Sequence, residues 1–263
     1  MTRCYYRRLP PIGDVQAFES TEYTGSNWDQ SIQHGSPPLA LMTKLIEEHA
    51  PPGMRIGRLV LDILGPIPVA PVRVRAWVQR PGARISLLTA EMSATRPDGS
   101  ERTVAGVSAW LLATGDTVDI ASDRYPPITE GEADPTRHAW QGAPGYLDSI
   151  RWERQRAGDA GAAVSWLSPL VSLVDGDDVT DMQRLAMVVD SANGAGAALD
   201  PDEFLFMNTD TAVHLHRVPR GNDFGLRARA SIGPDGIGVC NAEIFDRQGF
   251  IGTSAQTLLV QRR

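Results

Sequence analysis

The sequence predicts an α+β fold built from two similar halves, each with one central helix wrapped by a strongly curved antiparallel sheet. Three observations lead to this prediction. Short segments recur in the same order in both halves of the 263-residue chain, each half has one helical stretch followed by strand-like stretches, and a region rich in Pro, Gly and acidic residues separates the halves. A repeat at this scale constrains the architecture before any single element is assigned.

Three matches carry the repeat. VRVRA from Val72 resembles LRARA from Leu226, AEM from Ala90 resembles AEI from Ala242, and GVSA from Gly106 resembles GTSA from Gly252. The offset between the copies changes only at turn-like segments such as ATRPDGSER, where insertions cost little. Each match is weak alone, but their shared order indicates that both halves have the same order of elements.

In the first half, a short strand near residues 17–23 precedes a helix that begins at Pro37 and Pro38 and runs to His49. Proline is tolerated in the first turn of a helix, and apolar residues then recur at helical spacing until PPG ends the pattern. Four strands are predicted to follow, over residues 58–64, 72–79, 85–93 and 104–112.

In the second half, a short strand near residues 147–153 precedes a helix that begins at Thr180, which forms a capping-box pattern with Gln183. The run LAMVV is apolar nearly all round, so this helix should be buried. Four strands are again predicted, over residues 204–216, 225–231, 238–245 and 251–260.

This arrangement is the plan of a double hotdog, two fused hotdog domains each with a central helix in a curved antiparallel sheet. The predicted domains span residues 1–120 and 146–263, and a surface linker joins them over residues 121–145. We expect the two halves to pack sheet to sheet, like the subunits of a dimer.

Charge and composition exclude several classes of protein. Lys and Arg number 25 against 32 Asp and Glu, a net charge of -7, which disfavours a nucleic-acid partner. The N-terminal MTRCYYRRLPP is followed by no secretory apolar run, and no stretch is long enough to insert into a membrane. Cys4 and Cys240 have no metal-ligand spacing. We therefore expect a cytoplasmic protein with free thiols.

The predicted second helix carries one carboxylate, Asp190, within LAMVVDSANG. A charged side chain among apolar ones is unfavourable by several kcal/mol unless it is hydrogen-bonded or faces a wet cavity. Asp190 therefore lies in a functional site, points to solvent, or caps a neighbouring loop.

The strand that follows becomes polar where the first half is apolar. In FLFMNTDTAVHLHRVP, the alternate positions Asn208, Asp210, His214 and His216 are expected to share one face, close to the central helix. Two His and a carboxylate can bind zinc. Strand histidines are more often packing residues, however, so we expect no metal. In the last strand, Gln256 aligns with Trp110 of the first half, which again indicates a site.

The segments WDQSIQHGSPP, MVVDS, NTDTAVHLHR and AQTLL resemble the type II acyl-CoA thioesterase family, whose members are two fused hotdog domains. The resemblance implies a water held by an Asp on the second helix, a Thr, Ser or Asn on the next strand, and a Gln on the last strand. By position these are Asp190, Asn208 and Gln256. Gly-Ser follows His34 where relatives often have Gly-Gly.

Thioester hydrolysis suits these residue types. A carboxylate can take the proton of an attacking water, and two amides can orient that water. The backbone N–H groups of Gly35 and Ser36, just before the first helix, are candidate donors to the oxyanion. His34 either positions substrate or caps the helix. No Ser has a nucleophile-elbow context, so no covalent intermediate is expected. We also expect no cofactor.

The resemblance implies an acyl-CoA as small-molecule partner and is compatible with a homo-oligomer. Two alternatives remain open. One is a hotdog enoyl-thioester hydratase, which needs a catalytic His and acid that we do not find in a matching position. The other is a non-catalytic protein that binds acyl thioesters or lipids without turnover.

Overall fold

The computed structural model describes residues 3–128, 132–134, 143–156 and 163–263, and these form a single curved sheet with helices packed on it. The strands of the first half are β1 (Cys4–Ile12), β2 (Val15–Ser20), β3 (Met54–Ile63), β4 (Pro71–Arg80), β5 (Ile85–Thr95) and β6 (Glu101–Ala113). Those of the second half are β7 (Ile150–Gln155), β8 (Val164–Pro169), β9 (Ser172–Val174), β10 (Phe204–Asn208), β11 (Asp210–Leu215), β12 (Phe224–Ile232), β13 (Ile237–Asp246) and β14 (Gly249–Arg262). The helices are α1 (Ser36–Glu48), α2 (Asp181–Val189) and α3 (Ala192–Ala195), with 3-10 turns η1 (Glu22–Thr24), η2 (Val118–Ile120) and η3 (Gly145–Ser149).

Both predicted central helices are confirmed, with their local signals. Prolines occupy the first turn of α1, and the Thr180 side chain accepts a hydrogen bond from the Gln183 backbone N–H at 3.1 Å at the start of α2. The Gln183 amide group turns to Glu47 of α1, at 2.6 Å, instead of closing the capping box. The second half of that motif thus links the two helices.

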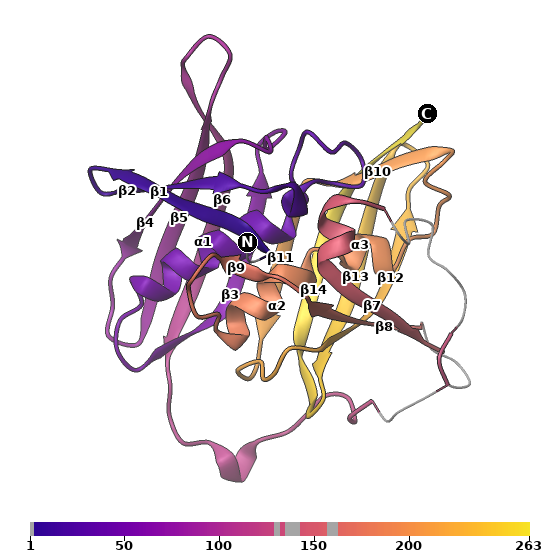
Figure 1. Cartoon of the computed structure of the whole chain (residues 1–263). Coiled ribbons are helices and arrows are strands. Elements are labelled where there is room, and N and C mark those ends of the chain that lie inside the picture. Colours follow the sequence, from indigo (N-terminus) through magenta and orange to yellow (C-terminus); the bar gives the residue numbers. More distant parts are fainter. Residues whose placement is uncertain (1–2, 129–131, 135–142, 157–162) are drawn as a thin grey trace.

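The two halves join edge to edge rather than face to face. The sheet runs in the order β7-β8-β12-β13-β14-β11-β3-β6-β5-β4-β2-β1-β9, and β3 pairs antiparallel with β11, with Leu59 opposite Val213. Figure 1 shows the indigo and purple first half beside the orange and yellow second half, with α1 and α2 lying on the sheet. At its far end, β9 of the second half pairs parallel with β1, so the halves interlock twice.

One hydrophobic core extends through both halves. It contains the apolar faces of α1 and α2, including Leu41, Leu45, Leu185 and Val188, all buried. The helices also contact each other directly. Because the apolar faces of α1 and α2 are buried in one shared core, the start of α1 and the end of α2 are held close together. Side chains at these two ends are held in place by the same packing.

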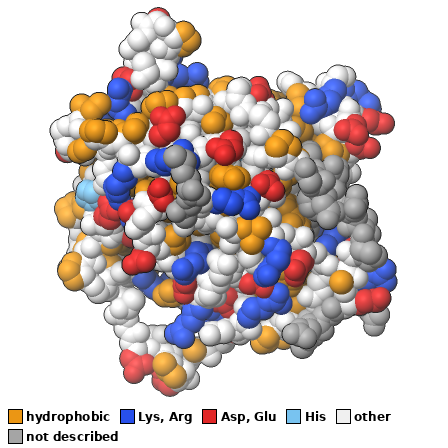
Figure 2. Space-filling view, in the orientation of Figure 1, with side chains coloured by type: hydrophobic (Ala, Val, Ile, Leu, Met, Phe, Trp, Pro, Cys, Tyr) orange, Lys and Arg blue, Asp and Glu red, His pale blue; other side chains and the backbone are white. Residues whose placement is uncertain are grey.

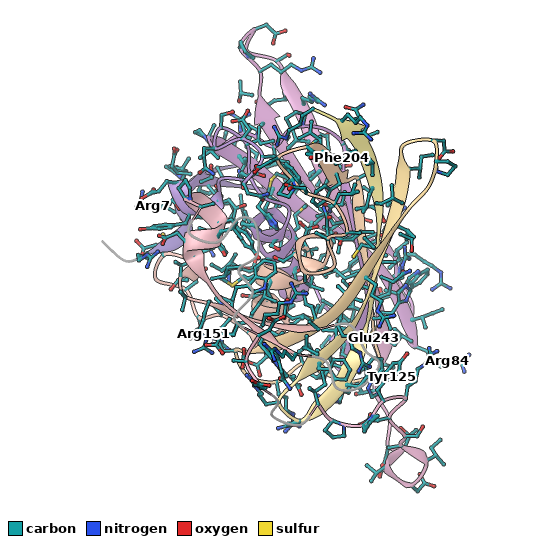
Figure 3. The ribbon with its side chains drawn as sticks, turned by 90° about the vertical axis from the view of Figure 1, so that its right-hand side faces the viewer. Arg7, Arg84, Tyr125, Arg151, Phe204 and Glu243 are labelled. Carbon is teal, nitrogen blue, oxygen red and sulfur yellow. The ribbon has the colours of Figure 1, made fainter. Side chains whose placement is uncertain are left out.

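A smaller cluster of Val164, Trp166, Phe245 and Phe250 receives Tyr125 and Ile128 of the predicted linker. Figure 3 shows Tyr125 beside Glu243, and the Arg227 guanidinium lies 5.1 Å from the Tyr125 ring centroid. Residues 129–131 and 135–142 of the predicted linker lie outside the described residues.

The face in Figure 2 has acidic and basic side chains interspersed. Cys4 and Cys240 are both buried and free of disulfides. Among the helices that the structure describes, none is long and apolar enough to span a membrane.

Candidate active site

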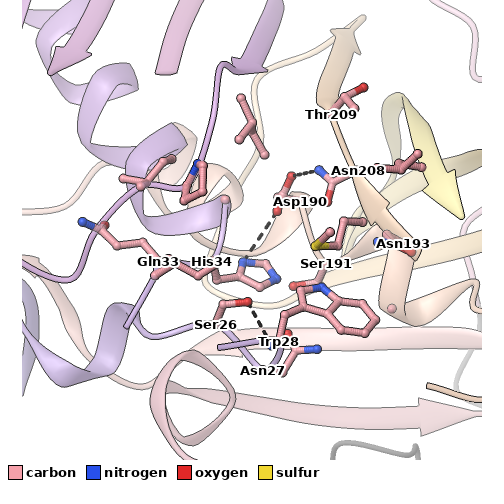
Figure 4. A pocket seen from close by; sticks show the side chains of 18 of the residues that line it. Ser26, Asn27, Trp28, Gln33, His34, Asp190, Ser191, Asn193, Asn208 and Thr209 are labelled. Carbon is pink, nitrogen blue, oxygen red and sulfur yellow. Dashed lines mark hydrogen bonds and ion pairs between the residues drawn. The ribbon is translucent and has the colours of Figure 1, made fainter. Parts of the chain in front are cut away.

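A cavity of about 260 Å³ lies where the two halves meet, between the start of α1, the end of α2 and strands β3 and β10. It is lined by Ser26, Asn27, Trp28, Ile32, Gln33, His34, Gly35, Ile63, Gly65, Pro66, Ile67, Leu147, Trp152, Asp190, Ser191, Asn193, Gly194, Met207, Asn208, Thr209 and Leu259. Most of the wall is apolar, and several polar groups gather near Asp190 (Figure 4). This combination is typical of a small-molecule site.

Asp190 directly follows the last residue of α2 and is 2% exposed. One carboxylate oxygen, Oδ1, accepts hydrogen bonds from Asn208 Nδ2 at 2.8 Å and from the Thr211 hydroxyl at 2.5 Å. The other, Oδ2, accepts none from any residue that the structure describes, and lies 3.6 Å from His34 Nδ1. The carboxylate is thus anchored through one oxygen and open through the other.

Gln256 on β14 holds both Asp190 and Thr211 by hydrogen bonds. It is 1% exposed, and its Nε2 donates to the Asp190 backbone carbonyl and to the Thr211 hydroxyl oxygen, both at 2.9 Å. Gln256 Oε1 is buried and has no partner among the described residues. Gln256 is not among the residues that line the cavity, so it contacts Asp190 and Thr211 rather than the cavity itself.

Gly35 leaves room for the carboxylate. A Cβ atom at this position would lie 2.5 Å from Asp190 Oδ2 and 2.8 Å from its Cγ, distances that real side chains do not tolerate. The absence of a side chain lets the carboxylate lie against the backbone at the N-terminus of α1. Because Pro37 and Pro38 carry no N–H, the free backbone donors at this helix start are few.

His34 is held in a single orientation. Its Nδ1 accepts a hydrogen bond from the Ser36 N–H at 3.1 Å, and its ring stacks on Tyr146 with centroids 3.8 Å apart. Burial lowers the pKa of His34, against the opposing charge of Asp190, which favours the neutral ring with the proton on Nε2. Figure 4 shows His34 on one side of Asp190 and Asn208 on the other.

Two family models match the chain. The model of the acyl-CoA thioesterase N-terminal domain matches residues 24–112, and that of the acyl-CoA thioesterase C-terminal domain matches residues 122–260. The chain belongs to the acyl-CoA thioesterase family. This membership supports acyl-CoA thioesterase as its function. No curated protein sequence matches the chain.

Solved structures resemble this thioesterase-family chain over nearly its whole length. A candidate thioesterase from Novosphingobium aromaticivorans has a TM-score of 0.72 at 16% identity, covering 96% of this chain and 97% of that one. A hotdog-fold protein of unknown function from Alicyclobacillus acidocaldarius has a TM-score of 0.70 at 15% identity, covering 96% and 95%. Acyl-CoA thioesterase II of Mycobacterium marinum has a TM-score of 0.62 at 13% identity, covering 97% and 96%. At these identities the likeness shows the hotdog fold alone.

The structure brings together five of the six predicted site residues of this family member. Asp190, Asn208, His34 and Gly35 line the cavity, and Gln256 contacts Asp190. Ser36 is fully buried and does not line it, and its N–H donates to the His34 ring. Of the two predicted backbone donors, only the Gly35 N–H remains without a partner among the described residues.

Thr211 is a member of the cluster that the sequence did not reveal. Strict alternation starting from Asn208 predicts that Asp210, His214 and His216 point inward with Asn208. It therefore predicts that Thr211 points outward. The structure contradicts this, because Thr209 is an extra residue between β10 and β11: Asn208 is opposite Leu258, whereas Ala212 is opposite Ala255. Such a bulge exchanges the two faces of a strand.

Beyond the bulge, Thr211, Val213 and Leu215 are buried, whereas His214 and His216 are exposed. The His216 Nε2 meets the Phe250 carbonyl oxygen at 2.8 Å. Over the described ranges, no group of three metal-ligand residues is found. In the sequence, Val213 and Leu215 alternate with His214 and His216, and counting back from these two apolar residues would have identified Thr211 as inward-facing.

Proposed function

We propose that this chain hydrolyses acyl-CoA thioesters to a free acid and CoA, by attack of a water activated by Asp190. The observation that carries the proposal is the asymmetry of the Asp190 carboxylate, anchored through Oδ1 by Asn208 and Thr211 and open at Oδ2 in the cavity. A general base needs one such free oxygen within reach of its water.

The neighbours of Asp190 have distinct roles in this proposal. Asn208, whose Oδ1 accepts no hydrogen bond from the described residues, orients the water between itself and Asp190 Oδ2. The Gly35 N–H and the His34 Nε2–H stabilise the oxyanion on the thioester carbonyl. The Ser36 N–H fixes the His34 ring, and Gln256 fixes the base. Every step uses groups of this chain, without a covalent intermediate.

The cavity volume supports short acyl groups as substrates. At about 30 Å³ for each water-sized group, 260 Å³ accommodates roughly eight to nine non-hydrogen atoms. The acyl chain packs between apolar walls such as Trp28, Ile67 and Leu259. We place the two fused hotdog units of this enzyme at residues 1–120 and 146–263, with the linker at 121–145.

The test is a hydrolysis assay with acyl-CoA substrates of increasing chain length. Asp190→Asn keeps the shape of the side chain but removes the base, so kcat should fall by roughly 10²- to 10⁴-fold. Asp62→Asn, at an exposed carboxylate on β3, is the matched control and should match the parent. Equal rates for Asp190→Asn and the parent would rule out this mechanism. A parent that binds acyl-CoA without hydrolysing it would make the chain a binding protein.

A further inference from the structure

The two central helices are related by an internal two-fold arrangement. The carboxylate of Asp190, just after α2, lies against Gly35 at the N-terminus of α1. In the reverse direction, Glu47 near the end of α1 accepts a hydrogen bond from the Thr180 hydroxyl at 2.9 Å, at the N-terminus of α2. Each helix therefore ends in a carboxylate that reaches the start of the other.

The sheet obeys the same relation. In the first half, the pairing of β3 with β6 shifts by one residue at Gly57. In the second half, the pairing of β10 and β11 with β14 shifts by one residue at Thr209. Ile56 precedes the first irregularity as Asn208 precedes the second. The site around Asp190 consequently has a geometric counterpart on the other side of the α1–α2 contact, beside Glu47.

A second cavity of about 260 Å³ occupies that counterpart position. It is lined by Glu47, Ala50, Met54, Arg55, Ile56, Leu111, Met182, Val218 and Pro219. The linings of the two cavities correspond. Arg55–Ile56 of the second cavity are equivalent to Met207–Asn208 of the first, and Val218–Pro219 are equivalent to Pro66–Ile67.

The second cavity lacks the groups for hydrolysis. Both Glu47 oxygens are within hydrogen-bond distance of the Thr180 hydroxyl, at 3.2 and 2.9 Å, and Oε2 also accepts from Gln183 Nε2 at 2.6 Å. Glu47 therefore joins the helices and has no free oxygen comparable to that of Asp190. Ile56 replaces the water-orienting amide with an apolar side chain. This cavity is suited to binding rather than catalysis.

Arg55 defines what the cavity can bind. Its guanidinium donates to the His216 backbone carbonyl at 2.7 Å and makes longer contacts with two further carbonyls, but forms no ion pair with any described residue. A guanidinium that contacts only neutral carbonyls at the edge of an apolar cavity can bind a carboxylate by donating hydrogen bonds to it. Glu47, whose oxygens point to α2, leaves the Arg55 end of the cavity to the ligand.

We propose that this second cavity binds a short aliphatic monocarboxylate, with its carboxylate on Arg55 and its chain against Met54, Ile56, Leu111 and Met182. A chain of six carbons with its carboxylate has eight non-hydrogen atoms, which matches the volume at about 30 Å³ each. The proposal rests on the lining of this cavity and not on the proposed hydrolysis.

Calorimetric titration with hexanoate tests the proposal. To separate the two cavities, the titration uses a Met207→Trp background, which fills the first cavity and leaves the second intact. Hexanoate should bind this protein, and Arg55→Gln should weaken binding roughly 10- to 100-fold through loss of the charged hydrogen bonds. Arg58→Gln, three residues along the same strand and outside the lining of the cavity, is the matched control and should leave binding unchanged.

Two further measurements keep the proposal falsifiable. Met182→Trp should abolish hexanoate binding by filling the cavity, even if Arg55→Gln folds poorly. Hexanol should bind more weakly than hexanoate. Equal affinities for hexanoate and hexanol, tighter binding of hexylamine, or undiminished binding to both variants would each overturn the proposal. Thioester hydrolysis by the single Arg55→Gln variant should equal that of the parent, so this result is independent of the proposed catalytic function.

Discussion

The two halves of the molecule share a backbone frame but differ in the polarity of a few inward positions. Ala90 and Ala242 begin the matching segments AEM and AEI. On the neighbouring strands, Ala90 is opposite Val107 and Ala242 is opposite Ser254, so Val107 and Ser254 are equivalent positions. Two residues further on, Ala109 of the first half corresponds to Gln256 of the second, and both are buried. The same register relates Leu59 to Thr211 and Ile56 to Asn208.

The difference in polarity between equivalent positions shows how a polar site is built in an apolar core. Burying hydrogen-bonding groups is unfavourable unless they pair, and in the second half they pair with one another. Thr211 donates to Asp190 and accepts from Gln256, so a single hydroxyl satisfies two partners. In the first half, apolar side chains at the same positions need no partners. The fold thus accepts polar residues here as a connected group rather than singly.

The largest expected effect concerns a buried ion pair that only the second half has. The Asp246 side chain is fully buried and accepts hydrogen bonds from Arg217 at 2.6 and 2.7 Å, whereas Ala94 occupies the equivalent position of the first half. Asp246→Ala leaves the Arg217 guanidinium without its carboxylate partner, so the free energy of unfolding should fall by about 3–5 kcal/mol. Urea denaturation measures it, with the exposed Asp62→Ala as control. Equal losses in both variants would contradict the prediction.

The same pair makes stability depend on pH. Burial alone would raise the pKa of Asp246, but hydrogen bonds from Arg217 and from the N–H groups of Gln248 and Arg220 hold it below its usual value. A lowered folded-state pKa stabilises the fold above the unfolded value of about 3.9, and this contribution is lost as pH falls through the folded-state pKa. Parent and Asp246→Ala should therefore converge in stability below about pH 4. A constant difference down to pH 2 would exclude this linkage.

Gly35 provides the next largest effect, on activity. Alanine at this position places a methyl group 2.5 Å from Asp190 Oδ2, so the carboxylate must move. A displacement of about 1 Å at a reacting group lowers the rate roughly hundredfold. Gly106→Ala is the matched control, because the nearest atom to its Cβ is 4.0 Å away. Steady-state hydrolysis rates for both variants check the prediction, and similar rates would remove Gly35 from the site.

The sequence predicted the helices well because their signals are local. The Pro pair of α1 and the Thr180 cap of α2 act within one turn, and the structure confirms both. Strand register was predicted less well, because it depends on pairing with distant strands. The segments GVSA and GTSA align Gly106 with Gly252, yet pairing shifts this by one residue, so Gln256 corresponds to Ala109 and not to Trp110.

A second one-residue irregularity, between β10 and β11, explains why one site residue was missed. Asp190 stood out as a carboxylate in an apolar run, and Asn208 came from the family resemblance. Thr211 was missed because an extra residue at Thr209 exchanges the faces of the strand, so the alternation counted from Asn208 does not extend to Thr211. The edge-to-edge joining of β3 and β11 likewise depends on contacts far apart in the chain.

Thr211 should have a smaller effect than Gly35, and it tests whether the connected polar group matters. Thr211→Val keeps the shape but removes the hydroxyl at 2.5 Å from Asp190 Oδ1, while Asn208 still holds that oxygen. We expect kcat to fall about tenfold with KM nearly unchanged, because the base is less well positioned. Thr211→Ser restores the hydroxyl and should recover most of the rate. Failure of Ser to recover it would indicate a packing role instead.

The smallest expected effect separates the two copies of a repeated ion pair. Arg227 and Glu243 are opposite each other on β12 and β13, 2.9 Å apart, as Arg75 and Glu91 are on β4 and β5 at 2.7 Å. The second-half pair is less exposed, and Arg227 also lies over Tyr125, so water and salt screen it less.

Glu243→Gln should therefore lower the free energy of unfolding by about 1 kcal/mol or less, and Glu91→Gln by a smaller amount. Urea denaturation at low and high salt measures both, and salt should reduce the difference between them. A larger loss from Glu91→Gln would mean that the linker residue Tyr125 does not shield the Arg227 pair, and that the two copies differ through their own strands alone.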